Sequence, residues 1–177
     1  IFTHKRPVPP PEIHSVKRGY TGTDGVLVPM VNGYREMKVA ATYDTPIAKD
    51  SLANHLHYMA MFGKPEEFGE HLWVMQKRRG IYDGEESIWV SDGAKWEWKQ
   101  KRYHDPEGKE ILDYIHAVKY LSELSTELYG EGTDRTKRWL QRMKKLRKEG
   151  GSKVLSSLER LSKKYSVEKL SATIEYY

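Results

Sequence analysis

The chain has 177 residues, of which 38% are hydrophobic and 31% are charged, and its formal net charge is +5. It contains no cysteine, which excludes disulfides and thiolate metal sites. No apolar run approaches the ~18 residues that a membrane-spanning helix needs, and the start shows no signal-peptide pattern. This composition favours one domain, or one domain with an appendage, built with long polar helices rather than as a dense β-sandwich.

Basic residues are concentrated in the last third of the chain. Residues 134–164 hold 12 Lys and Arg against 3 Asp and Glu, a local charge of +9. The remainder of the chain therefore carries −4 of the net +5. This division predicts cations as ligands of the front part and a polyanion as the partner of the back part.

The first predicted elements are an extended lead-in and a β-hairpin. The run RPVPPPE within residues 1–19 excludes a regular helix or a central strand, because proline fixes the backbone and removes donors. Residues 24–31 then predict a strand, and Asn32-Gly33 is the strongest short hairpin signal. In the stretch that follows, residues at every second position are apolar, which predicts the second strand of the hairpin.

Two helices and a strand are expected next. Asp50 is a candidate cap for a helix over residues 51–62. A second helix over residues 65–79 has proline and acids at its start, bases at its end and Gly80 after it. The stretch ESIWV then predicts a short strand that ends at Asp92.

The last part of the sequence is predicted to be almost entirely helical. A short strand over residues 110–112 precedes a helical apolar pattern that starts at Asp113. Three further helices are predicted over residues 134–149, 152–165 and 167–177. Mixed strands and helices therefore come first, and helices alone follow.

Asp24 and Asp92 are candidate metal ligands, because each precedes a glycine at the edge of a predicted strand. Neighbouring strands lie ~4.8 Å apart, so carboxylates on adjacent strands can point into one small volume. A hard divalent cation removes their repulsion, and two such ions can assist an in-line displacement at phosphorus. The alternative is that both Asp-Gly pairs are ordinary turns.

Asp113 and His116 form a second candidate pair. Their i, i+3 spacing at the start of a predicted helix places both side chains on one face. The carboxylate there also meets the positive end of the helix dipole. The pair could hold a metal, orient a phosphate or support Asp92. The alternative is a helix cap with a histidine that packs or faces solvent.

Basic and aromatic residues offer candidate nucleic-acid contacts. Residues 135–148 hold eight Lys and Arg and no acid, opposite an apolar face. This basic face could follow phosphates, or it could simply be a solvated helix surface. The candidate DNA-binding residues are Arg135, Lys137, Arg138, Arg142, Lys144 and Lys145. Trp96 and Trp98 either stack on unpaired bases or pack beside Asp92.

Three stretches in order, TDGVLVPMVNGYREMKVAATY, VSDGAKWEWKQ and ILDYIHAVKYL, resemble the catalytic region of bacterial insertion-sequence transposases of the Mutator-like DDE group. The resemblance covers roughly residues 20–177. It implies an α/β ribonuclease-H-like fold, a mixed sheet flanked by helices, with an all-helical insertion on the C-terminal side. The expected divisions are a lead-in at 1–19, a partial catalytic core at 20–130 and the insertion at 131–177.

The resemblance also implies roles for the candidate residues. Asp24 and Asp92 would be the first and second catalytic acids and would bind Mg²⁺, with Mn²⁺ as a substitute. Asp113 and His116 would be the supporting D-x-x-H pair of the group. The group's late catalytic glutamate and its amino-terminal DNA-binding region have no counterpart here, and Glu175 is in the wrong context for that role. The chain, which starts at Ile1 rather than Met, is therefore expected to be a central fragment that is inactive alone.

The function implied by the resemblance is DNA transposition. A DDE transposase hydrolyses a phosphodiester bond at a transposon end and joins the freed 3′ hydroxyl to target DNA. The expected partners are double-stranded DNA and, in the full-length form, further copies of the protein, in the nucleoid region of the cytoplasm and without a membrane. The alternatives are a DNA-binding remnant without catalysis and a ribonuclease-H-like nuclease without joining activity.

Overall fold

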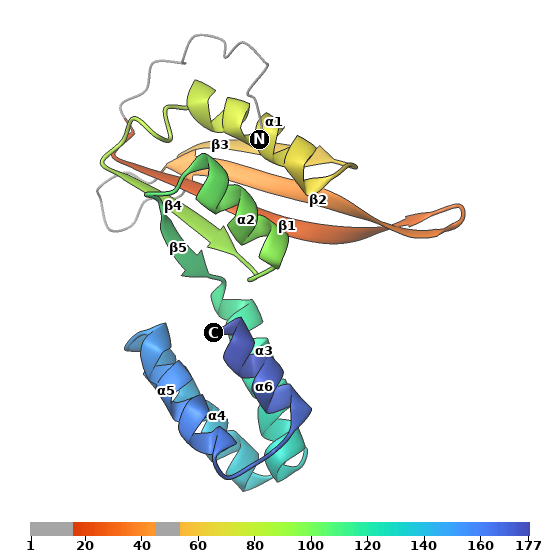
Figure 1. The fold of residues 1–177 in the computed structure, drawn as a ribbon, viewed down its shortest axis with the longest axis vertical. Helices are drawn as coiled ribbons and strands as arrows, with labels where there is room; N and C mark the ends of the chain where they lie inside the picture. Colours follow the sequence, from red (N-terminus) through yellow and green to blue (C-terminus); the bar gives the residue numbers. More distant parts are fainter. Residues whose placement is uncertain (1–15, 45–53) are drawn as a thin grey trace. The chain divides into compact units, whose positions relative to one another are not determined.

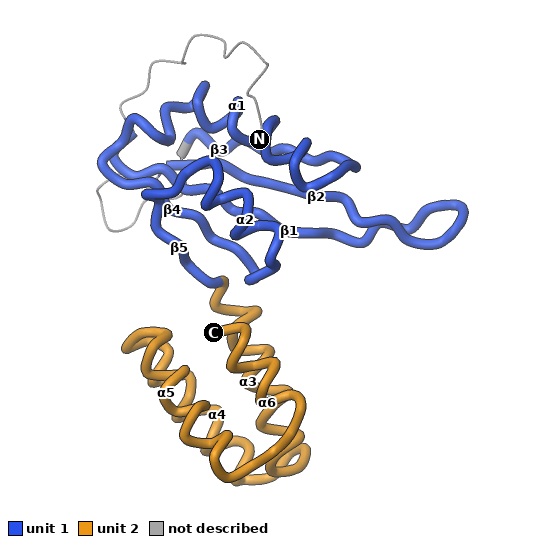
Figure 2. Tube along the Cα trace, viewed as in Figure 1, with its two compact units in different colours: residues 1–112 blue, residues 113–177 orange. Residues whose placement is uncertain are grey.

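The computed structural model describes residues 16–44 and 54–177, and the chain divides into two compact units, Ile1–Leu112 and Asp113–Tyr177 (Figure 2). The boundary lies before the helix Tyr114–Tyr129 (α3), and not after it as the sequence predicted. The reason is that the apolar side chains of α3 are buried among those of the later helices. Residues 1–15 of the predicted lead-in lie outside the described residues.

The first unit is an α/β structure. Its described residues form a five-stranded sheet with the order β3-β2-β1-β4-β5 (Figure 1). The pairs β1–β2 and β2–β3 are antiparallel, whereas β1–β4 and β4–β5 are parallel. The strands are β1 (Arg18–Met30), β2 (Gly33–Asp44), β3 (Asn54–Met61), β4 (Glu86–Ser91) and β5 (Lys109–Leu112). This mixed sheet with flanking helices agrees with the predicted fold class and is compatible with a ribonuclease-H-like fold.

The predicted hairpin is present, but its first strand starts earlier than expected. The turn at Asn32-Gly33 joins β1 to β2, and Gly33 adopts a φ of 110°, which side chains rarely tolerate. Because β1 begins at Arg18, Asp24 lies inside the strand and not at its start. Thr21 and Thr23 are buried on one face of the strand, so Asp24 belongs to the other face.

The prediction of a helix over residues 51–62 is wrong, because the described part of this stretch forms the edge strand β3. Its side chains alternate between the two faces of the sheet. Met59 and Met61 pack against the core, whereas Tyr58, which directly precedes Met59, is 74% exposed. The proposed cap at Asp50 lies outside the described residues.

Two helices cover one face of the sheet. The helix α1 (Pro65–Arg78) matches the prediction, with Glu66 and Glu67 in its first turn. Phe68 and Leu72 from α1 pack on Trp89 of β4, and Trp96 meets the Phe68 ring edge-on, with ring centroids 5.6 Å apart. The tryptophans Trp96 and Trp98 therefore pack beside this core, as in the second of the two predicted alternatives.

The helix α2 (Lys95–His104), which carries these tryptophans, was not predicted. Its buried residues are polar and recur at helical spacing: Glu97, Gln100, Lys101 and His104. An apolar periodicity is therefore missing from the sequence of α2.

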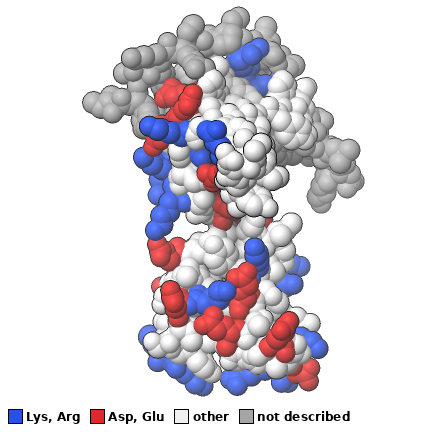
Figure 3. All heavy atoms as spheres, turned by 90° about the vertical axis from the view of Figure 1, so that its right-hand side faces the viewer, with Lys and Arg blue, Asp and Glu red and all other residues white. Residues whose placement is uncertain are grey.

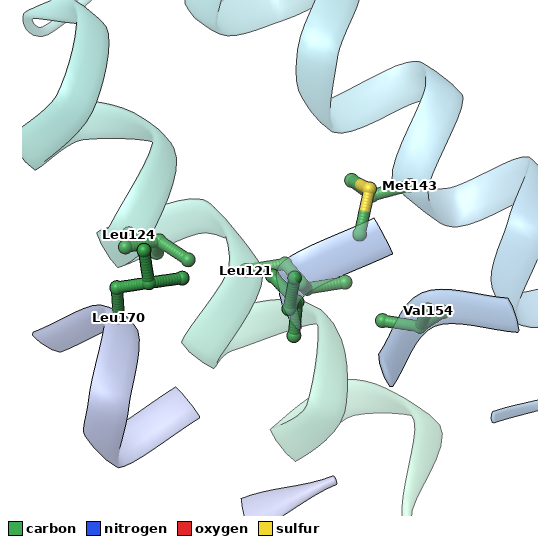
Figure 4. Close-up of a cluster of buried hydrophobic side chains, with 6 residues drawn as sticks. Leu121, Leu124, Met143, Val154 and Leu170 are labelled. Atoms are coloured by element: carbon green, nitrogen blue, oxygen red, sulfur yellow. The ribbon is translucent and has the colours of Figure 1, made fainter. Parts of the chain in front are cut away.

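The second unit, whose residues 113–177 are all described, consists of four helices. They are α3, α4 (Asp134–Lys148), α5 (Gly151–Ser162) and α6 (Glu168–Tyr176). Their core contains Leu121, Leu124, Met143, Val154, Leu158 and Leu170 (Figure 4). The four helices predicted for this part of the chain are thus confirmed. Among the described residues, none of the helices combines the length and the apolarity needed to cross a bilayer.

Candidate functional site

Asp24 lies on β1, and Asp92 directly follows the neighbouring parallel strand β4. The parallel register pairs Arg18 with Glu86 and Gly22 with Val90, a constant offset of 68 residues. Asp24 and Asp92 have the same offset, each two residues beyond the Gly22–Val90 pair. Residues in register on parallel strands project from the same face. Asp92 itself follows Ser91, the last residue of β4, and the paired residues end at Gly22 and Val90, so the adjacency of the two carboxylates stays a prediction.

Backbone hydrogen bonds hold both aspartates in place. Asp24 Oδ1 accepts a hydrogen bond of 2.7 Å from its neighbour Gly25, and Asp92 Oδ1 accepts one of 2.9 Å from Ala94. Between Asp92 and Ala94, Gly93 has a φ of 99° and donates its N–H to Ser91 Oγ at 3.0 Å. The glycine of the S-D-G motif thus permits a tight turn that fixes the Asp92 side chain.

Glu97 is a third carboxylate at this place, and the sequence analysis missed it. This residue of α2 is 0% exposed, and its Oε2 accepts a hydrogen bond from the Ser91 hydroxyl. Burial raises the pKa of Glu97 to about 8, the Ser91 hydrogen bond lowers it, and the charges of Asp92 and Asp24 raise it further. Asp24, Asp92 and Glu97 thus interact electrostatically, and we call them the acidic cluster.

The donor set of the acidic cluster suits a hard cation. Mg²⁺ prefers oxygen ligands and commonly takes one or two protein carboxylates, with waters and phosphate oxygens in the remaining positions. Across residues 16–44 and 54–177, no three His, Asp or Glu side chains converge in an arrangement that could hold a metal ion. The role of Asp24 and Asp92 as ligands of such a partly hydrated Mg²⁺ therefore stays a prediction.

The other candidate pair, Asp113 and His116, belongs to the second unit and forms a helix cap. Asp113 Oδ1 accepts hydrogen bonds from the backbone N–H groups of Ile115, at 2.8 Å, and His116, at 3.0 Å. His116 Nδ1 lies 3.4 Å from the same oxygen, close enough for an ion pair when the imidazole is protonated. The capping alternative is therefore present in the structure and gives Asp113 a role in stabilising α3.

Replacing Asp113 tests this capping role. We expect Asp113→Ala to lower the opening free energy of the first turn of α3 by about 1 kcal/mol, because two backbone N–H groups lose their acceptor. Asp113→Asn retains an acceptor oxygen and should match the wild type. Native-state hydrogen exchange of the Ile115 and His116 amides in the whole chain measures the difference. Equal protection in the Ala variant would contradict the capping role.

The basic residues of α4 lie mainly on its exposed face. The buried side of the helix, around Met143, joins the core of the second unit. Of the predicted DNA-binding residues, Arg135, Lys137, Arg138, Arg142 and Lys145 are exposed and Lys144 is half-buried. In the view of Figure 3, acidic and basic side chains are mixed over the surface.

Arg135 differs from the other cations of α4. Its guanidinium lies 4.5 Å from the centroid of the Tyr129 ring, and it donates a hydrogen bond of 3.4 Å to the Tyr165 hydroxyl. Arg138, Arg142 and Lys145 follow at spacings of four and three residues and share one face of the helix. These three residues, which we call the basic stripe, form no ion pair within 4.0 Å with any acid of the described residues.

No family model matches the chain, and no curated protein shows a significant match to it. The functional assignment therefore rests on the residues themselves.

Proposed function

We propose that this chain carries the catalytic aspartates of a DDE-type DNA transposase, on a ribonuclease-H-like core that a helical insertion interrupts. The observation that carries the proposal is the register of β1 and β4, in which Asp24 and Asp92 keep the 68-residue offset of the paired residues. The strand order β3-β2-β1-β4-β5 supports it as well, because Asp24 lies on the central strand β1 and Asp92 directly follows its parallel neighbour β4. Carboxylates so arranged suit metal-dependent phosphodiester chemistry.

The residues of the chain would act mainly by positioning. Asp24 and Asp92 would hold Mg²⁺, or Mn²⁺ in its place, at the end of β4, and the turn at Gly93 would keep Asp92 oriented toward it. When bound, the metal lowers the cost of forming the attacking oxygen and stabilises the leaving oxygen. Without a cation, two carboxylates at one site would repel each other, which would favour metal binding.

A strand-transfer assay tests this function. The protein tested should be the product of the whole reading frame that encodes this chain. The substrate should be a labelled DNA duplex that carries the ends of the transposon. We expect Mg²⁺-dependent cleavage and joined products, both lost in Asp92→Asn. Cleavage without joined products would support the nuclease alternative. Metal-independent DNA binding without any cleavage would contradict catalysis and support the remnant.

The basic stripe supports DNA binding whether the protein is an active transposase or a DNA-binding remnant. Three unpaired cations on one helix face can replace counterions along a phosphate backbone, and such binding weakens steeply as salt rises. Arg138 and Arg142 add forked guanidinium donors that match phosphate oxygens. We therefore infer that α4 is the surface of the second unit that contacts double-stranded DNA.

Replacing the basic stripe should flatten the salt dependence of DNA binding. For the triple variant Arg138→Gln, Arg142→Gln and Lys145→Gln, we expect the slope of log K against log salt to fall by about one for each cation removed. Fluorescence anisotropy with a duplex across a salt series measures this slope. The matched control removes three cations that are already in ion pairs with acids, Lys99, Arg102 and Lys109. Equal slopes for the stripe variant and the control would refute the assignment.

A further inference from the structure

We propose that a basic cavity between β3 and α1 binds a phosphate monoester group, an inference that goes beyond the proposed function and does not depend on metal binding by Asp24 and Asp92. The cavity has a volume of about 290 Å³, and its lining residues all belong to the first unit. This volume is at the lower end of the range of ligand pockets. It suits a phosphate group that carries a small organic part.

The cavity is bounded by one face of α1 and by the edge strand β3. On the helix, His71, Met75 and Arg78 follow at spacings of four and three residues, so they project from the same side. On the strand, His57 and Met59 are two residues apart and share one face, on which Met59 packs against the core. Side chains from two elements therefore line one space.

The lining of this cavity is basic. Four of its side chains are histidine or arginine, and no acidic side chain of the described residues joins them in the lining. They are His57, His71, Arg78 and Arg79. The two guanidinium groups are always charged, and their forked donors match phosphate oxygens. Two such charges also match the nearly double negative charge of a phosphate monoester.

Arg79 is fixed against the edge strand. It is 5% exposed, and its Nη2 donates a hydrogen bond of 3.2 Å to the backbone carbonyl of His55. His55 has a φ of 49°, a left-handed conformation that costs energy for a residue with a side chain. Its ring lies 3.0 Å from the carboxylate of Asp44, which helps to hold this conformation. Backbone strain of this kind is concentrated at ligand sites, and here it positions a buried guanidinium beside the cavity.

The end of the helix dipole does not cancel this positive charge. The negative end of the α1 dipole lies near the two arginines, and its strength comes from carbonyl groups without a partner. Three of these carbonyls, those of residues 75–77, accept backbone hydrogen bonds of 3.0 to 3.1 Å from residues 79–81. The arginines and histidines therefore set the sign of the charge at the cavity.

Methionine methyl groups can report binding in this cavity. In the whole chain with ¹³C-labelled methionine methyl groups, we expect phenyl phosphate to shift the signals of Met59 and Met75, which line the cavity. The signal of Met143, in the core of the second unit, should stay unchanged. Phenol, which lacks the phosphate, should give no saturable shift. Shifts at Met143 alone, or equal shifts with phenol, would overturn the proposal.

A substitution in the lining tests the role of charge. Arg78 is exposed, so Arg78→Gln should leave the fold intact. We expect this variant to bind phenyl phosphate roughly ten- to hundredfold more weakly, because it loses a charged hydrogen-bond donor. The matched control Arg102→Gln removes an exposed guanidinium of α2 that pairs with Glu110 and should bind like the wild type. Equal affinities of Arg78→Gln and the wild type would also overturn the proposal.

A second probe identifies the source of the phosphate. If a DNA duplex with a 5′ phosphate shifts Met59 and Met75 at lower concentration than phenyl phosphate does, the cavity binds a DNA end. If phenyl phosphate alone shifts them, the ligand is a small phosphate monoester. If neither probe shifts them at millimolar concentration, the proposal fails, whereas the proposed function is tested separately by the strand-transfer assay.

Discussion

Replacing either aspartate of the adjacent pair should almost abolish Mn²⁺ binding by this chain. Asp24→Asn and Asp92→Asn each remove one of the charges that attract the cation and leave the shape of the side chain nearly unchanged. The expected loss exceeds the roughly 10- to 100-fold that removal of an outer hydrogen-bond partner typically causes at metal sites. Isothermal titration with Mn²⁺ at constant pH measures it.

A double variant sharpens this test. If Asp24 and Asp92 hold the same ion, the second substitution should cost far less than the first, because the ion is already lost. Independent sites would instead give additive losses. Asp44→Asn is the matched control, since Asp44 lies at the end of β2 and pairs with His55 at 3.0 Å. Retained affinity in both single variants would defeat the metal site.

The stability of the metal-free chain should fall as pH rises from about 4.5 to about 8. Glu97 has a pKa of about 8 in the folded chain, against an ordinary value of 4.5, chiefly because it is buried. Across this window the folded state keeps a proton that the unfolded chain has lost. The free energy of unfolding should therefore decrease by about 1.4 kcal/mol per pH unit where the slope is steepest. Below pH 4.5 this stabilisation is fully present.

Glu97→Gln should remove this slope, because the amide does not titrate. Urea unfolding in the presence of a chelator, at several pH values between 5 and 8, compares the variant with the wild type. The pKa values of Glu86 and Glu123 are lowered, through hydrogen bonds to Lys109 and Lys169, so these two groups change their protonation below this pH window. Parallel stability curves for the wild type and Glu97→Gln would show that Glu97 is not held protonated by the fold.

Much of the fold could be predicted from local signals. The hairpin turn at Asn32-Gly33 needs a positive φ that glycine supplies, and Pro65 with the acids behind it marks the start of α1. The helices of the second unit were predictable because each buries an apolar stripe of helical period. In these elements, local preference and tertiary burial agree.

The sequence-based predictions failed for the elements whose conformation depends on tertiary packing. The strand β3 alternates only partly between apolar and polar residues. Its sequence around Met59 therefore did not indicate a strand at the edge of the sheet. The helix α2 buries Glu97 and Gln100, which an apolar pattern cannot predict. The place of Asp92 directly after a strand was predictable, whereas Asp24 lies inside β1 rather than at its start, and the burial of Glu97 leaves no apolar pattern in the sequence.

Crystals of the chain soaked in Mn²⁺, with anomalous diffraction to locate the ion, would show the proposed site itself. If Asp24 and Asp92 coordinate one shared cation, the anomalous difference map should show a single strong peak at the end of β4. This peak should lie about 2.1 Å from an oxygen of Asp24 and from an oxygen of Asp92. A peak elsewhere on the chain, with these two side chains turned to opposite faces of the sheet, would contradict it.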